Sequence, residues 1–129
     1  MTDLVTQAAW VLAAAFVLSL VYELYRATAK AGTSRHDSRA SFVKNNAALY
    51  VVAALVIALL FAGFEWAPWV GLTFSGVVTA ASILFYNPKI LLERDPGIVD
   101  WFEDLLFTSL VFLAMALLFY QVLGVTLEP

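Results

Sequence analysis

Residues 46–86 read NAALYVVAALVIALLFAGFEWAPWVGLTFSGVVTAASILFY, and Glu65 is the only charged residue among them. A helix needs about 20 apolar residues to cross ~30 Å of hydrocarbon. The stretch is therefore long enough to cross a bilayer twice, with a tight turn around Glu65. It predicts two membrane-spanning helices, at about 46–64 and 67–86.

Two further apolar stretches flank this pair, at about 4–25 and 104–123. Just before the last of them, apolar residues recur with the i, i+3, i+4, i+7 spacing of an amphipathic helix, at Ile98, Trp101, Phe102, Leu105 and Leu106. We therefore predict an all-α fold. Four transmembrane helices form an antiparallel bundle, and a short interfacial segment precedes the fourth. Residues 1–129 make one transmembrane domain.

Proline and glycine mark the expected helix ends. Pro68 suits the first turn of the third helix. Asn87-Pro88 predicts the end of that helix, because proline disfavours helical geometry in the residue before it. Asp95-Pro96-Gly97 predicts the start of the fourth helix, with Asp95 as its N-cap.

The composition agrees with a membrane protein and excludes several other classes. Of the 129 residues, 63% are hydrophobic and 13% are charged, whereas a soluble domain carries roughly a quarter charged residues. Without cysteine, thiolate metal sites, iron–sulfur clusters and cysteine nucleophiles are excluded. His36 is the single histidine, and the net charge of −3 argues against nucleic-acid binding. We expect no cofactor and no enzymatic activity.

All seven lysines and arginines fall in the first and third connections between the spans, at Arg26, Lys30, Arg35, Arg39, Lys44, Lys89 and Arg94. The positive-inside rule places such connections in the cytoplasm. It predicts a multi-pass plasma-membrane protein with both termini outside.

Glu23 and its neighbour Tyr22 lie near the inner end of the first span. An ionisable residue in a membrane helix is a candidate ion or proton site, because its burial is costly. The alternative is a structural pair with Arg26, three residues on along the same helix.

A second candidate ion or proton site consists of Asp100, Glu103 and Asp104, which share one helical face at i, i+3 and i+4. We expect this face to dock against basic residues of the first connection rather than to hold a metal ion, and the expected partners are Arg35, Arg39 and Lys44. The alternative is a divalent cation with oxygen ligands.

Small residues predict where helices pack closely, because apolar burial alone does not drive association in lipid. Ala54 and Ala58 form such a row on the second span. The third span carries a wider face, made of Gly71, Ser75, Gly76 and Thr79. We expect these two faces to pair.

Two functions remain compatible with these features. The first is a non-catalytic structural or accessory subunit that lies in the lipid bilayer. It forms a homo-oligomer or packs with larger membrane partners. The second is a small oligomeric channel or transporter for an ion or small solute, which uses Glu23 and the serine and threonine face of the third span.

Overall fold

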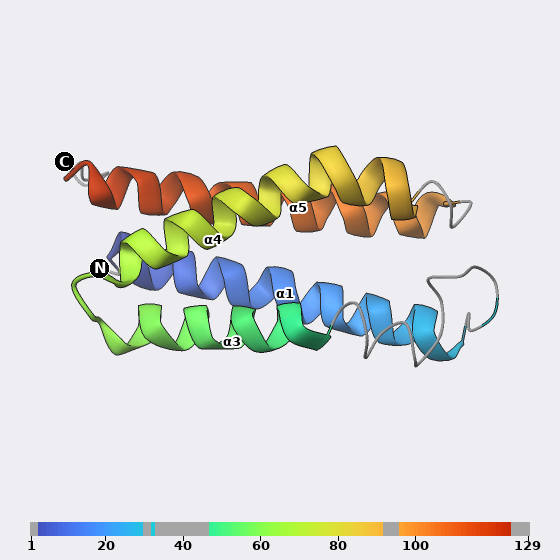
Figure 1. The fold of residues 1–129 in the computed structure, drawn as a ribbon, viewed down its shortest axis with the longest axis horizontal. Coiled ribbons are helices and arrows are strands. Elements are labelled where there is room, and N and C mark those ends of the chain that lie inside the picture. The colour runs from blue at the N-terminus through green and yellow to red at the C-terminus, as the bar shows by residue number, and fades with distance from the viewer. Residues whose placement is uncertain (1–2, 30–31, 33–46, 92–95, 125–129) are drawn as a thin grey trace.

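The computed structural model describes residues 3–29, 32, 47–91 and 96–124, except for the side chains of residues 89–91. The described chain is all-helical, and Figure 1 shows the helices lying lengthwise beside one another. In chain order the elements are α1 (Leu4–Thr28), α3 (Ala47–Ala62), α4 (Ala67–Ala81), the π-helix η2 (Ser82–Leu91) and α5 (Ile98–Val122).

Three of the described helical segments are long and apolar enough to cross a membrane, namely Leu4–Thr28, Ala67–Pro88 and Ile98–Val122. The fourth, α3, is equally apolar but shorter. It ends at Ala62, before the predicted residue 64, because Gly63 adopts a φ of +82° that side chains with a Cβ rarely tolerate. Residue 46, its predicted start, lies outside the described residues.

The starts of α1 and α5 are set by acidic side chains. Asp3 precedes α1, and its Oδ1 accepts a hydrogen bond from the Thr6 amide at 2.7 Å. The predicted interfacial segment is the first part of α5, which runs without a break from Ile98. Gly97 is the N-cap of α5, two residues later than predicted, because the acid that meets the free backbone amide there is Asp100, which follows the cap.

Helix α1 packs against both α3 and α5, and α4 packs mainly against α5. Phe16 shows how the four helices meet. Its ring, which is buried, lies 6.2 Å from that of Tyr50 on α3, 5.6 Å from Phe74 on α4 and 5.2 Å from Phe107 on α5. Such aromatic contacts add to the apolar burial that holds the helices together.

The predicted pairing of the small-residue faces of α3 and α4 does not occur between these two helices. Ala54 and Ala58 are exposed on α3. The buried face of α3 is instead Ala53, Val56 and Leu60, which lies at different helical positions.

The small face of α4 is mostly buried, but its partners are leucines rather than alanines. Gly71, Ser75 and Thr79 are buried and Gly76 is partly so. A Cβ at Gly71 would lie 2.8 Å from Cδ1 of Leu118 on α5 and 3.1 Å from Cδ2 of Leu60 on α3. A glycine here therefore allows two bulky side chains to approach the α4 backbone.

The apolar span ends at Pro88, near the predicted residue 86, but the helix does not stop at Asn87-Pro88 as predicted. At Ser82 it passes into η2, a π-helix that continues through Pro88 to Leu91. Such i→i+5 segments are uncommon and are often found at functional sites. Two contacts of Asn87 favour continuation of the helix. With its amide nitrogen facing inward, Asn87 donates to the Ser82 carbonyl at 3.0 Å and to Oδ1 of Asp104 at 2.7 Å.

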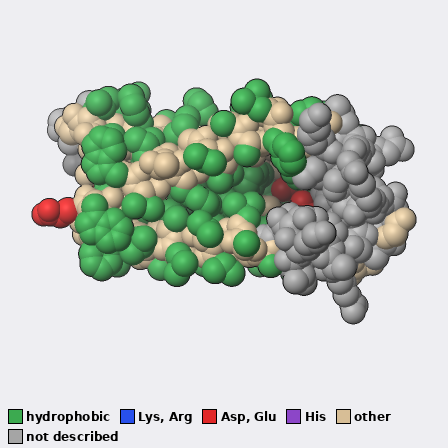
Figure 2. Space-filling view, viewed as in Figure 1, with side chains coloured by type: hydrophobic (Ala, Val, Ile, Leu, Met, Phe, Trp, Pro, Cys, Tyr) green, Lys and Arg blue, Asp and Glu red, His purple; other side chains and the backbone are tan. Residues whose placement is uncertain are grey.

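The exterior along the described helices is apolar, as the green surface in Figure 2 shows. Red acidic side chains appear in two places: one projects from the left end, and others lie in a recess toward the right. The first turns of α5 make the contrast sharpest. Ile98 is 89% exposed and Phe102 is 64% exposed, whereas Asp104 is only 2% exposed. These first turns direct their acids inward and large apolar side chains outward, the reverse of a helix on a water-soluble protein.

Candidate functional site

The last turns of α1, the π-helix η2 and the first turns of α5 meet at one end of the molecule (Figure 1). Together they carry a set of polar side chains that we call the polar cluster: Tyr22, Glu23, Arg26, Tyr86, Asn87, Asp100, Glu103 and Asp104. The five charged members are all buried. Burial of charge at this density is costly unless the groups are paired and hydrogen-bonded.

Asp100 joins α5 to α1. Its Oδ1 accepts a hydrogen bond from the Tyr22 hydroxyl at 2.5 Å and lies 3.5 Å from Nη1 of Arg26. Its other oxygen, Oδ2, accepts from the Gly97 amide at 2.8 Å. One carboxylate therefore caps α5, where a negative charge also suits the helix dipole, and at the same time fixes α5 against α1.

The π-helix contributes two further links. The Tyr86 hydroxyl donates to Oε1 of Glu23 at 3.3 Å, and the Asn87 amide donates to Asp104. Because Glu23 is on α1 and Asp104 is on α5, η2 bridges the two helices through consecutive residues.

The structure brings together residues that the sequence presented as two separate candidate sites. Tyr22 and Glu23 lie on the same buried cluster as Asp100, Glu103 and Asp104. One contact between them is the Tyr22–Asp100 hydrogen bond.

The predicted partners of the acids, Arg35, Arg39 and Lys44, lie outside the described residues. Arg26, which the sequence suggested as a partner for Glu23, contacts Asp100. Sequence reasoning missed Tyr86 and Asn87 as members of the cluster. The available signal was a polar pair directly after an apolar span.

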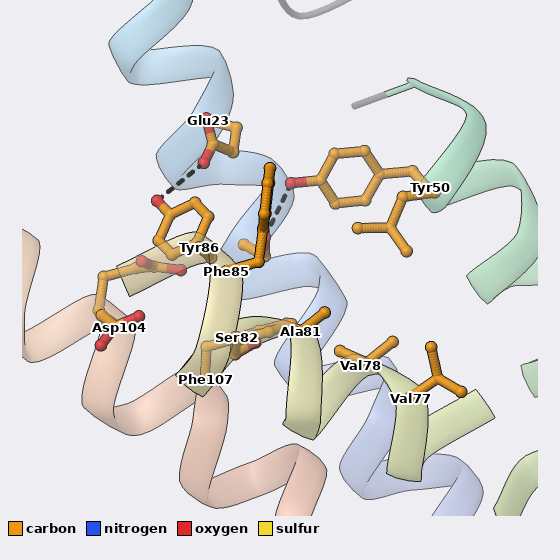
Figure 3. A pocket seen from close by; sticks show the side chains of 13 residues that line it. Glu23, Tyr50, Val77, Val78, Ala81, Ser82, Phe85, Tyr86, Asp104 and Phe107 are labelled. Carbon is orange, nitrogen blue, oxygen red and sulfur yellow. Dashed lines mark hydrogen bonds between the residues drawn. The ribbon is translucent and has the colours of Figure 1, made fainter. Parts of the chain in front are cut away.

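A cavity of about 270 Å³ lies beside the cluster, between α1, α3, α4–η2 and α5. Figure 3 shows Glu23, Tyr86 and Asp104 on one side of it, Tyr50 on the other, and Phe85 between the two tyrosines. The Tyr50 hydroxyl is hydrogen-bonded to Oγ of Ser19 at 2.7 Å. The cavity therefore combines carboxylates with aromatic rings.

The small hydroxyl side chains of α4 are turned toward their own helix. Ser75 donates to the Gly71 carbonyl at 2.8 Å, and Thr79 donates to the Ser75 carbonyl at 2.7 Å. Such bonds satisfy the hydroxyls locally.

In the ranges that the structure covers, no group of three or more His, Cys, Asp or Glu side chains is arranged to hold a metal ion. Comparison of the chain with protein families, with curated proteins and with solved structures found no match.

Proposed function

We propose that the chain is a small multi-pass protein of the plasma membrane, without catalytic activity of its own, that serves as a structural or accessory subunit. The observation that carries this proposal is the apolar exterior. Large hydrophobic side chains are exposed on every described helix, among them Val17, Leu55, Val77 and Phe112. A contiguous apolar surface of this extent is unstable in water but is matched by hydrocarbon.

In this proposal the four helices form an antiparallel bundle across the bilayer. The polar cluster lies toward the cytoplasmic face, because Arg26 at the end of α1 adjoins the basic first connection. The α3–α4 turn and both termini then lie outside. The inward position of the acids supports this arrangement, since a charged side chain facing lipid is costly.

Single-cysteine labelling tests the orientation cleanly because the chain has no cysteine. Glu65, which is exposed in the α3–α4 turn, is replaced by cysteine in one variant and Ser38, in the first connection, in another. In intact cells we expect a membrane-impermeant maleimide to label Glu65→Cys at once and Ser38→Cys only after permeabilisation. The opposite order of labelling would invert the topology. If neither variant is labelled in intact cells and both are labelled in lysate, the α3–α4 turn lies inside.

The proposal includes association with copies of this chain or with larger membrane proteins. Ala54, Ala58 and Ala62 recur every fourth residue on α3 and are all exposed. Rows of small residues let helices approach closely in lipid. The row supports an assembly face on the outside of α3.

Native mass spectrometry of the gently extracted chain tests this association. We expect Ala58→Leu to shift the spectrum from a complex toward the monomer, because leucine separates the facing backbones. Ala48→Leu is the matched control, since Ala48 is also exposed on α3 but lies off the row. A chain that is monomeric before substitution, without co-extracted subunits, would contradict the accessory role.

One observation favours a second function, a small oligomeric channel or transporter for an ion or small solute. The cavity beside the polar cluster has Glu23 and Asp104 in its wall. A solute path through the bilayer needs such a polar recess between helices. Solute flux into liposomes that contain the purified chain separates this function from the accessory role.

A further inference from the structure

The wall of the cavity has two chemically distinct parts. Carboxylates contribute one part, through Glu23, Glu103 and Asp104. Aromatic rings contribute the other, and four of them line the space: Tyr50, Phe85, Tyr86 and Phe107. Aromatic faces carry partial negative charge and attract cations, so both parts of the wall favour a positively charged ligand.

The cavity also reaches the outer surface of the molecule. Leu49 on α3 and Val77 and Phe85 on α4–η2 line it, and all three side chains are exposed. The opening therefore lies between α3 and α4–η2, and an apolar rim surrounds it. A ligand can enter from the side of the bundle without separating α1 from α5.

The hydrogen bonds of the carboxylates restrict which cation fits. Glu23 already accepts from Tyr86, and Asp104 accepts from Asn87. A metal ion such as calcium requires six or more oxygen ligands and would displace these donors. A quaternary ammonium group has no N–H to donate and needs only nearby negative charge and aromatic faces, so it leaves both hydrogen bonds in place.

We propose that this cavity binds the trimethylammonium group of a small organic cation, with Glu23 and Asp104 supplying the charge and Tyr50 and Phe85 supplying ring faces. Its volume of about 270 Å³ is just below that of typical small-molecule pockets, which are roughly 300–1,000 Å³, and suits a headgroup-sized ligand. This inference goes beyond the accessory role and does not depend on it. The membrane placement matters only for one source of the ligand, a lipid headgroup.

The test uses the full chain, purified in a neutral detergent, with choline as the probe and its uncharged analogue 3,3-dimethyl-1-butanol as the control. Calorimetric titration and the thermal unfolding midpoint are both recorded. We expect choline to bind saturably and to raise the midpoint, because a ligand that binds only the folded state stabilises it. The uncharged analogue should do neither.

Two variants connect binding to the cavity. We expect Phe85→Ala to weaken choline binding at least about threefold, the loss expected for a cation–π contact, and Asp104→Asn to weaken it further. Phe85 is 57% exposed, so its truncation leaves the packed interior unchanged. Phe112→Ala is the matched control, because that ring is 55% exposed on α5 and does not line the cavity.

The trimethylammonium group can belong to a lipid or to a soluble solute, and nanodiscs separate these sources. If the lipid headgroup is the ligand, phosphatidylcholine nanodiscs should weaken the binding of free choline relative to phosphatidylglycerol nanodiscs. Equal affinity in both assigns the site to a soluble cation.

Equal binding of choline and its uncharged analogue, or unchanged affinity in the folded Phe85→Ala variant, would overturn the proposal. Because topology labelling is measured separately, such a result would leave the membrane assignment standing.

Discussion

Replacing Arg26 with methionine should destabilise the folded chain by about 3–5 kcal/mol, the cost of leaving a buried charge without its partner. Arg26 is 5% exposed, and its guanidinium lies 3.5 Å from Asp100. Methionine fills a similar volume without the charge. Tyr22 still donates to Asp100 in the variant, but a neutral hydroxyl does not replace the positive charge.

A double-mutant cycle with Asp100→Asn, which removes the charge but keeps an oxygen acceptor at this position, separates the ion pair from packing effects. The double variant should be more stable than Arg26→Met alone, because no unpaired carboxylate remains at that position. Arg26→Lys, which keeps the charge, is the control and should lose less. The measurement is reversible unfolding in mixed micelles, followed by circular dichroism. If Arg26→Met proves as stable as the wild type, the Arg26–Asp100 pair has no structural importance.

Gly71→Leu should be the second most damaging substitution, with a loss of about 2–3 kcal/mol from overpacking. Even a single Cβ at this position would lie 2.8 Å from Leu118 and 3.1 Å from Leu60. Leucine adds three more carbon atoms in the same space. The helices α3 and α5 must then move away from α4. In the proposed bilayer setting, apolar burial gives little force to compensate for this separation.

Gly76→Leu is the matched control for this prediction. A Cβ at Gly76 would meet only the sulfur of Met115, at an ordinary 3.7 Å, and methionine adapts readily to new neighbours. Trimming the obstructing side chain in Gly71→Leu/Leu118→Ala should recover part of the loss. Both comparisons use the same unfolding measurement. Equal losses at Gly71 and Gly76 would show that the close approach at Gly71 is unimportant.

The approximate positions of the apolar helices could be predicted from the sequence because length and apolar composition decide them, whereas their exact ends could not. The inward face of a helix could be predicted only where polar residues break the apolar pattern. On α5, Asp100, Glu103 and Asp104 mark the buried face. On α3 nearly every residue is apolar, so nothing distinguishes the buried Ala53 from the exposed Ala54, and spacing alone favoured the wrong face.

The charged members of the candidate site were predictable, but Tyr86, Asn87 and the connections between the members were not. Glu23 and the acids of α5 stand out because ionisable residues are rare beside apolar spans. Tyr86 and Asn87 do not stand out, since their role depends on the path of η2. Local preference predicts a helix end at Asn87-Pro88. The contact that Asn87 makes across the bundle instead favours continuation of the helix. A tertiary contact of this kind leaves no local pattern.

The division of the polar cluster between the first and last helices of the chain matters during synthesis. Glu23 and Arg26 leave the ribosome with α1, long before α5 supplies Asp100, and chains are made N-terminus first. Before α5 is made, Glu23 can meet the Tyr86 hydroxyl of η2, but the contact between Arg26 and Asp100 cannot form. In the proposed membrane placement, contact with lipid is unfavourable for these charges. We expect α1 to wait with this end among the headgroups and to settle only when α5 arrives. We expect a chain truncated before α5 to lack the Arg26–Asp100 contact and therefore to be degraded faster in cells than the full chain.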